Sequence, residues 1–256
     1  MNDSAYPCRF LEWDTSFFGK RIAQVQGSSL NQEFIRLVID WCDEQSIDCL
    51  YFLSTADDLE TVRIAEDHGF RLVEIRFTLE RSLKDWDPET RPRSAENILI
   101  RPAVFEDIPD LQEIARQSYV DSRFYFDKNF SSKLWGDYYA TWVKKSCEGG
   151  ADLALTAVMD NRTVGYITGL VDQQTNQGIY ELTGVSESER RSGVGQELFR
   201  SGLDWYVRHA IDYLRVATQG RNIKTQRMIQ RHGFLSKSCQ FYFHKWFSDQ
   251  NAPNPD

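Results

Sequence analysis

The sequence predicts an α/β (α+β) fold in which helices and strands alternate around a mixed sheet, in two related halves. Three observations support this prediction. Residues 32–77 align without a gap on residues 196–241 at an offset of 164, with 14 identities in 46 positions. Helical and strand periodicities alternate along most of the chain. A glycine-bearing loop also lies between an apolar strand and an amphipathic helix.

Composition argues against several classes of protein. The 256 residues include 30 Lys and Arg against 38 Asp and Glu, a formal net charge of −8. Since basic residues are not clustered, we expect neither nucleic acid nor a membrane as partner. Five scattered cysteines and four histidines lack metal-ligand spacing, so we expect no metal and a reducing compartment. With no signal peptide and no apolar run of roughly 18 residues, we expect a soluble, cytoplasmic protein.

Each copy of the repeat predicts a helix, a short apolar strand, a second helix and a long strand. The strands cover residues 49–54 and 72–79 in the first copy, and 213–218 and 236–247 in the second. Each second helix ends at His-Gly-Phe, where Gly69 or Gly233 suits the left-handed position that closes a helix. Residues 1–85 therefore look like a partial, degenerate version of the second half.

The second half follows a predicted linker at residues 86–96, which holds two prolines and little apolar content. Residues 97–256 then predict a strand at 98–101 and helices at 106–119 and 132–147. Three strands follow at 152–158, 164–171 and 179–185, and the turn residues Asp160 and Asn161 predict a hairpin between the first two. The third strand leads into the glycine loop.

The glycine loop, residues 190–195, carries the clearest chemical signal. Gly lets backbone N–H groups approach an anion closely, and a helix N-terminus adds partial positive charge, so a pyrophosphate would fit there. The alternative is a flexible turn between strand and helix.

The loop resembles the R/Q-x-x-G-x-G/A signature of the GCN5-related N-acetyltransferase (GNAT) family, with Arg190, Gly193 and Gly195 in place. Asn222 and the Gly233-Phe234 pair match the family's next landmarks. The resemblance covers about residues 97–247 and implies a sheet that splays between strands 179–185 and 213–218, with acetyl-CoA in the opening. It implies these cofactor-binding residues: Leu182, Thr183, Gly184, Val185, Arg190, Arg191, Ser192, Gly193, Val194, Gly195, Gln196 and Asn222. The first copy has Gln26, Ser29 and Asn31 at the signature positions and is not expected to bind CoA.

Three further stretches resemble the family members that acetylate dTDP-linked fucosamine. They are residues 11–19, residues 121–124 with Tyr139 and Trp142 downstream, and residues 214–219. This resemblance implies a nucleotide-linked amino sugar as acceptor, in surface-polysaccharide synthesis. Ser122, Arg123, Phe124 and Tyr139 are the candidate acceptor-binding residues, because Arg binds phosphate and aromatic rings pack on a base or sugar. Alternatively, the rings are core anchors and Arg123 forms a surface ion pair.

Acetyl transfer needs a base for the amine and a proton for the departing thiolate. Glu181, on the predicted strand 179–185, is the candidate base, unless it faces outward in an ion pair. A backbone N–H at Gly184 or Val185 is the candidate oxyanion donor. Where the family has a tyrosine acid, this chain has Ile229, so we take Tyr242 as the catalytic candidate, with Tyr180 and His232 as alternatives. Because His232 has the counterpart His68 in the first copy, a structural role is favoured for it.

Two other functions stay open at this point. The acceptor could instead be a protein, a peptide or another small-molecule amine, or the chain could be a non-catalytic acyl-CoA sensor. The aromatic C-terminal strand could form the edge of a homodimer or belong to the core.

Overall fold

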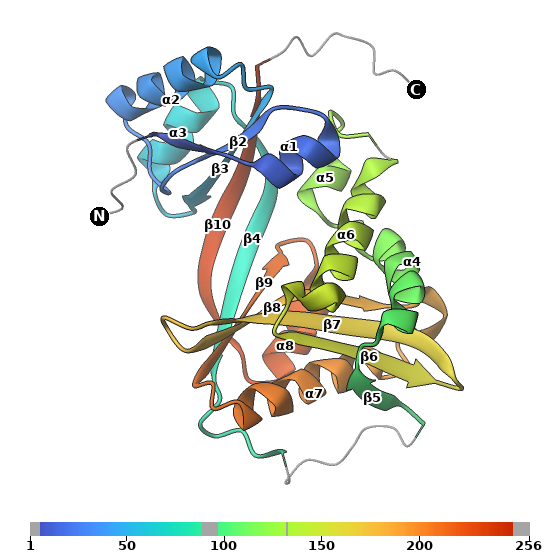
Figure 1. The fold of residues 1–256 in the computed structure, drawn as a ribbon. Coiled ribbons are helices and arrows are strands. Elements are labelled where there is room, and N and C mark those ends of the chain that lie inside the picture. The colour runs from blue at the N-terminus through green and yellow to red at the C-terminus, as the bar shows by residue number, and fades with distance from the viewer. Residues whose placement is uncertain (1–5, 89–96, 132, 248–256) are drawn as a thin grey trace.

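One ten-stranded mixed sheet runs through the molecule in the computed structural model, which describes residues 6–88, 97–131 and 133–247 (Figure 1). The strand order is β1-β2-β3-β10-β4-β9-β8-β7-β6-β5. The remaining part of the predicted linker, residues 89–96, lies outside the described residues. The predicted α/β class with a mixed sheet is confirmed.

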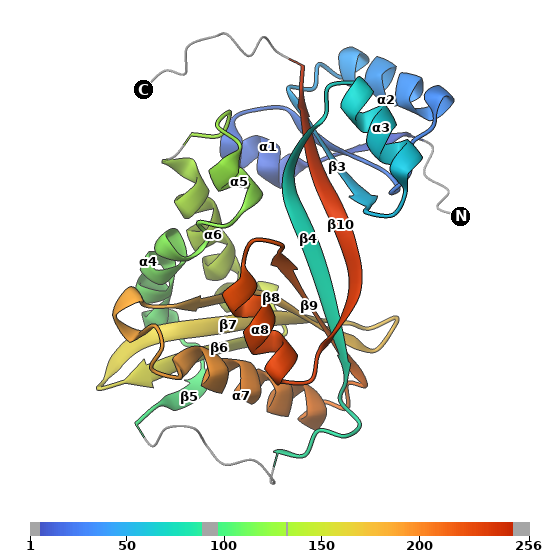
Figure 2. The ribbon, with the colours of Figure 1, turned by 180° about the vertical axis from the view of Figure 1, so that it is seen from behind.

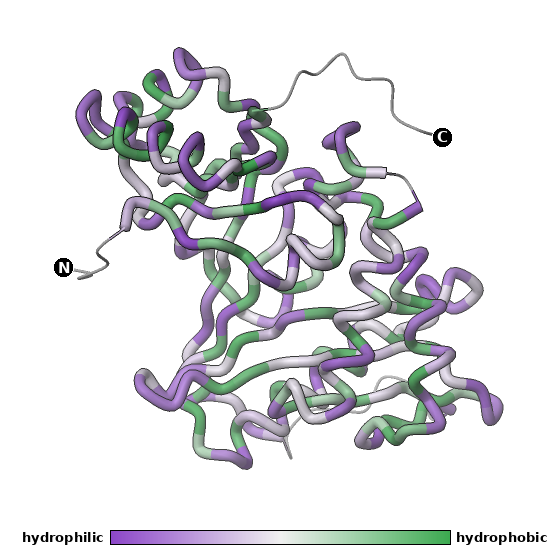
Figure 3. Tube along the Cα trace, turned by 45° about the horizontal axis from the view of Figure 1, so that its top comes forward, coloured by the Kyte–Doolittle hydropathy of each residue, from purple (hydrophilic) through white to green (hydrophobic). Residues whose placement is uncertain are grey.

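The elements of the first half follow the predicted order. They are β1 (Cys8–Phe10), α1 (Glu12–Phe18), β2 (Ile22–Val25), α2 (Gln32–Glu44), β3 (Cys49–Thr55), α3 (Leu59–Asp67) and β4 (Arg71–Ser82). Hydrophilic and hydrophobic residues alternate along the helices near the N-terminus (Figure 3), as expected for helices with one buried face.

The second half begins with β5 (Leu99–Pro102), the short turn η2 (Phe105–Asp107), α4 (Ile108–Ser118), α5 (Arg123–Phe126), α6 (Leu134–Lys145) and η3 (Ser146–Gly150). It continues with β6 (Leu153–Met159), β7 (Arg162–Asp172), β8 (Gln177–Val185), η4 (Glu187–Glu189), α7 (Val194–Arg208), β9 (Tyr213–Gln219), α8 (Ile223–Arg231) and β10 (Leu235–Trp246). Asp160 and Asn161 both have positive φ, which confirms the predicted hairpin turn. The segment between the two predicted helices 106–119 and 132–147 contains the helical turn α5.

The repeat is reproduced in three dimensions. The bounds of β3, α3 and β4 correspond to those of β9, α8 and β10 at the same offset of 164. Gly69 and Gly233 have φ of +76° and +80°, which confirms their role in closing α3 and α8.

The two halves exchange their last strands. β4 does not pair with β3 of its own half but with β9, and β10 pairs with β3 instead of β9 (Figure 2). The registers are equivalent, since Gln240 opposite Thr55 corresponds to Arg76 opposite Gln219. β4 and β10 also pair with each other, with Gln240 opposite Arg76, so a local pseudo-twofold axis passes between these two residues. The halves therefore share one continuous sheet.

The exchange has two consequences for the expectations from sequence. β10 lies inside the sheet with a neighbour on each side, so the C-terminal strand belongs to the core and offers no free edge for a dimer. Trp86, which begins the predicted linker, is buried, and its indole N–H donates to Asp204 of α7 at 2.8 Å. The chain is thus packed against the second half up to that point.

Candidate functional site

The sheet opens between β8 and β9, as the family resemblance implied. The two strands pair in parallel only from Gln177 opposite Tyr213 to Tyr180 opposite Val216. Beyond this point β9 continues beside β4, while β8 pairs only with β7. The edge of β8 from residue 181 to residue 185 is therefore free of β9.

Hydrogen-bond alternation decides which backbone groups of β8 face this opening. Ser186 N donates to Val164 O at 2.9 Å, so in the antiparallel ladder the backbone N–H and C=O of Gly184, two residues earlier, also point toward β7. The backbone N–H and C=O of Thr183 and Val185 point the other way, into the opening. Of the two predicted oxyanion donors, only the Val185 amide is directed there.

The glycine loop lies at the mouth of the opening. A Cβ added to Gly195 would stand 3.6 Å from Val185 Cγ2, at the end of β8. Gly193 has φ of +96° and is the N-cap of α7. Because glycine has no side chain, the first backbone amides of α7 receive no hydrogen bond from a capping side chain. Open space surrounds the Gly193 Cα, because an added Cβ would meet nothing within 4 Å.

Not every residue expected at the anion site has a free group. The amides of Ser192 and Gln196 already donate to Glu189 O and Gly193 O, at 3.3 and 3.0 Å. The Val194 side chain is buried in the core. Arg190 Nη2 donates to Gln117 O at 3.4 Å, which ties the loop to the end of α4.

Asn222 has a structural role as the N-cap of α8. Its Oδ1 accepts from Thr225 N at 3.2 Å, and in the first half Asp58 caps α3 through Thr61 in the same way. Helix capping explains why a residue with a side-chain oxygen is needed at this position, while the Asn222 side-chain amino group is still available as a hydrogen-bond donor.

Glu181 lies half-buried on β8, and its Oε2 is buried with no hydrogen-bond partner in the part of the chain that the structure describes. Burial raises the pKa of this carboxyl group, a hydrogen bond from Trp142 opposes the increase, and the charge of Asp152 adds to it. No outward ion pair of Glu181 is present within residues 6–88, 97–131 and 133–247. The Glu181 carboxyl group is therefore half-buried and is not held in a surface ion pair.

The proposed acids lie in different places. Ile229 is fully buried in the core beneath α7, and Tyr180 on the same side donates its hydroxyl to Phe199 O at 2.7 Å. His232 Nδ1 is 3.0 Å from Met228 O, a contact that His68 repeats in the first half, so its role there is structural. Tyr242 is buried on the opposite face of the sheet.

Tyr119, which the sequence did not single out, is at the opening itself. Its hydroxyl is 3.2 Å from Thr183 O and 2.9 Å from the hydroxyl of Tyr166, and its ring stacks on Tyr139 at 4.0 Å. Burial raises the pKa of Tyr119 well above its usual value, so the hydroxyl stays protonated. Its place at the end of a predicted helix was the only available signal.

Arg123 occupies a buried polar cluster between the halves, here called the Arg123 cluster: Asp14, Tyr51, Glu74, Ser122, Arg123, Tyr242 and His244. The guanidinium lies 4.4 Å from the Tyr242 ring centroid and 5.3 Å from that of Tyr51. Phe124 is a core residue, as one alternative held, but Arg123 forms no ion pair at the surface in the described ranges.

Several polar atoms of the Arg123 cluster lack partners among the described residues. They are Tyr51 OH, Arg123 Nε and His244 Nε2. His244 Nδ1 is 2.7 Å from Asp127 Oδ2, and burial lowers the pKa of the imidazole to about 4. The ring is therefore neutral, and its Nε2 is an acceptor without a donor.

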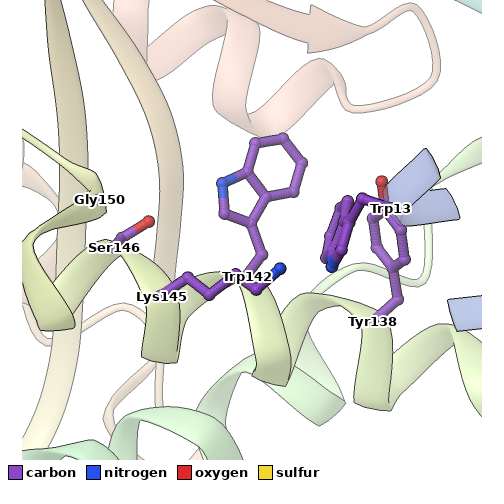
Figure 4. Close-up of a pocket in the computed structure, with 6 residues that line it drawn as sticks. All are labelled: Trp13, Tyr138, Trp142, Lys145, Ser146 and Gly150. Carbon is purple, nitrogen blue, oxygen red and sulfur yellow. The ribbon is translucent and has the colours of Figure 1, made fainter. Parts of the chain in front are cut away.

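A pocket of about 430 Å³ lies beside this cluster, between α1 and α6. Half of its lining residues are aromatic, and both halves of the chain contribute: Trp13, Tyr138, Trp142, Lys145, Ser146 and Gly150 (Figure 4). Neither a cluster of residues able to hold a metal ion nor a helix long and apolar enough to cross a membrane occurs in the part of the chain that was searched, residues 6–88, 97–131 and 133–247.

A mixed sheet that splays beside a glycine loop and an uncapped helix defines a class of acyl-transferring domains. Residues 109–234 match the acetyltransferase (GNAT) family. The chain carries an acetyltransferase domain of the GNAT family.

Solved structures share the fold of both halves. The GCN5-related N-acetyltransferase from Sphaerobacter thermophilus is 17% identical, with a TM-score of 0.67, over 94% of this chain and 76% of that one. A tandem GNAT protein from the clavulanic acid biosynthesis pathway is 13% identical, with a TM-score of 0.63, over 91% and 77%. At these identities the likeness concerns the fold.

One relative is similar in sequence, the spore coat polysaccharide biosynthesis protein SpsD of Bacillus subtilis (strain 168). It is 22% identical over 134 residues, which are 52% of this chain and 46% of that protein. The match thus spans less than half the length of the relative.

Proposed function

We propose that this protein transfers an acetyl group from acetyl-CoA to the primary amine of a nucleotide-linked amino sugar. One observation carries the donor half of the proposal: β8 parts from β9 directly beside the uncapped start of α7. The opening presents free backbone groups of β8, and its mouth presents helix amides, which suits an amide-containing arm that ends in a pyrophosphate.

The donor residues have distinct roles in this proposal. The amides of Gly193, Val194 and Gly195 hold the pyrophosphate, because the first amides of a helix are free and lie at its positive end. Thr183 and Val185 pair with the arm through their backbone groups. The amino group of Asn222 holds the arm from the other side.

The reaction requires a neutral amine nitrogen. Glu181 accepts the amine proton, for which its raised pKa suits it. The lone pair of the neutral amine forms the new C–N bond to the acetyl carbon as the C–S bond breaks. The proton that Glu181 accepts is the one that the nitrogen gives up as it becomes an amide, and the leaving sulfur takes the electron pair and a second proton. We add Tyr119 to Tyr242 as a second candidate source of that proton, since the Tyr119 hydroxyl lies at Thr183 O in the opening.

Support for the sugar acceptor comes from the Arg123 cluster and the relative. Partnerless hydroxyl, guanidinium and imidazole groups suit a ligand rich in hydroxyl groups, and Ser122, Arg123, Phe124 and Tyr139 come together there. The name of the relative refers to polysaccharide biosynthesis. Acetyl-CoA as donor and the free cysteines among the described residues favour the cytoplasm.

Ile229, at the position of the family's tyrosine acid, favours one competing function, a non-catalytic acyl-CoA sensor, because no aliphatic side chain can donate a proton. A protein, peptide or other small amine as acceptor is the other alternative. Calorimetric titration with acetyl-CoA followed by a thiol-release assay on nucleotide-linked amino sugars, peptides and polyamines separates these functions. Binding with turnover of a nucleotide sugar supports the proposal, whereas binding without turnover supports the sensor.

Two matched pairs of variants sharpen this experiment. Glu181→Gln should retain acetyl-CoA binding, lower kcat by about 100-fold or more and remove the acidic limb of the pH profile. Glu66→Gln, a matched change at an exposed position, should leave both kcat and the pH profile unchanged. Gly193→Glu should abolish binding, while Gly193→Ala bears the same backbone strain without the charge and should bind more tightly than Gly193→Glu. Equal losses in both glycine variants would contradict the anion site.

A further inference from the structure

The pocket between α1 and α6 offers a binding site of its own. It measures about 430 Å³, within the range of small-molecule sites, and a first-half helix supplies one wall while a second-half helix supplies the other. We propose that this pocket binds the nucleoside phosphate end of the acceptor, an inference that rests on the proposed function.

The aromatic walls suit a flat ring. Trp13 and Trp142 are only half-buried, and their ring centroids are 6.2 Å apart at an angle of 77°. The two indoles lie next to each other in Figure 4, and the Tyr138 ring packs against Trp13 with ring centroids 4.5 Å apart. A nucleobase that stacks on an indole face gains roughly 1–3 kcal/mol, and such stacking tolerates different bases.

The pocket also has a cation without an anionic partner. The Lys145 ammonium lies 4.6 Å from the Trp13 ring centroid, and no carboxylate in the described part of the chain is within 4 Å of it. The neighbouring Lys144, by contrast, is 3.8 Å from Glu148. In a chain with a net charge of −8, an ammonium without a carboxylate partner beside the Trp13 indole favours a ligand that combines an aromatic ring with a phosphate.

The position of the pocket fits the chemistry of the proposed reaction. Trp142 lines the pocket, and its side chain also lowers the pKa of the Glu181 carboxyl group, so the pocket lies close to that residue. A ligand with its nucleobase near Trp13 and its phosphate near Lys145 would therefore extend its sugar past Trp142 toward Glu181, the proposed general base. This arrangement gives the first half, which has no CoA signature, a part in acceptor recognition.

The test is a titration of the full chain with thymidine diphosphate, uridine diphosphate, glucose 1-phosphate and inorganic pyrophosphate, followed by tryptophan fluorescence and calorimetry. Saturating acetyl-CoA is present, because a nucleoside diphosphate could also enter the CoA site. We expect both nucleoside diphosphates to bind more tightly than the other two probes. Equal binding of all four probes would overturn the nucleoside assignment, and no binding would overturn the site.

Three variants connect the binding to the pocket. Trp13→Ala should raise the Kd of the nucleoside diphosphates by about 5- to 100-fold, as expected from the loss of one stacking contact. Lys145→Ala should raise it by about fivefold and weaken its salt dependence, whereas Lys144→Ala, one residue away, should leave it unchanged. Unchanged binding in Lys145→Ala or an equal loss in both lysine variants would contradict the proposal.

The two proposals can fail separately. Retained acetyl-CoA binding without nucleotide binding would overturn the pocket assignment alone. If the protein does not bind acetyl-CoA but binds nucleotides in a way that depends on Trp13 and Lys145, the proposed function is wrong and the pocket assignment is retained.

Discussion

The exchange of β4 and β10 predicts that the second half cannot fold without the first. In a chain cut to residues 97–256, β10 loses both of its neighbours, β3 and β4, and β9 loses β4. The sequence repeat alone suggests the opposite, because residues 97–256 contain every motif of a complete acetyltransferase domain.

The size of the loss follows from the strand registers. β10 has seven register pairs with β3 and nine with β4, and β9 has seven with β4. With roughly one hydrogen bond per pair and about 1 kcal/mol net for each, the truncated chain loses on the order of 20 kcal/mol. This exceeds the roughly 5–15 kcal/mol by which folded domains are usually stable. If β10 took the place of β4 beside β9, it would recover about seven pairs and leave its other edge open.

The assay compares three samples by circular dichroism, urea unfolding and gel filtration. They are the full chain, residues 97–256 alone, and residues 97–256 produced together with residues 1–96. We expect the fragment alone to aggregate or to unfold without cooperativity, and the two fragments together to form a stable complex. A monomeric 97–256 fragment that unfolds cooperatively, with the stability of the full chain, would refute the reasoning.

Three further predictions concern single residues. Tyr119→Phe should lower kcat without changing the Kd of acetyl-CoA, and Tyr166→Phe should lower kcat less. Steady-state kinetics and calorimetry would measure these two quantities. Equal kcat in the wild type and Tyr119→Phe would exclude Tyr119 as the acid. Gly184→Ala places a Cβ 2.6 Å from Tyr166 Cε1, so urea unfolding should show a loss of about 1–3 kcal/mol, and an unchanged midpoint would contradict the packing. Burial lowers the pKa of His244 to about 4, below its unfolded value of about 6.5, so stability should fall by about 3 kcal/mol as the pH drops from 6.5 to 4. His244→Asn, which keeps a donor for Asp127, should flatten this dependence in urea unfolding, and a slope like that of the wild type would count against it.

Much of the fold could be predicted because it depends on local pattern. The strands and second helices of the repeat, the hairpin turn at Asp160 and Asn161, and the helix ends at Gly69 and Gly233 all rest on short-range periodicity or on backbone angles that few residues adopt. The glycine loop and its helix were recognised for the same reason, since the motif contains its own geometry. These features need no knowledge of what lies opposite them.

The partners of these elements could not be predicted from the sequence. The repeat is compatible with β10 beside β9 or beside β3, because both copies have equivalent registers. Arg123, expected at the surface or on a phosphate, lies among side chains from distant elements, such as Tyr51 of β3 and Tyr242 of β10. Tyr119 becomes a candidate acid only because the turn after α4 places its hydroxyl at Thr183 O.

The sequence by itself determined the class of the sheet, the two-copy architecture and the place of the glycine loop, because each depends on residues close together in the chain. Only the tertiary structure decided that the halves exchange their last strands, and that Trp13 and Trp142 form one pocket beside Glu181. Contacts between residues more than a hundred positions apart depend on how the strands are ordered, and local propensity contains no information on that order.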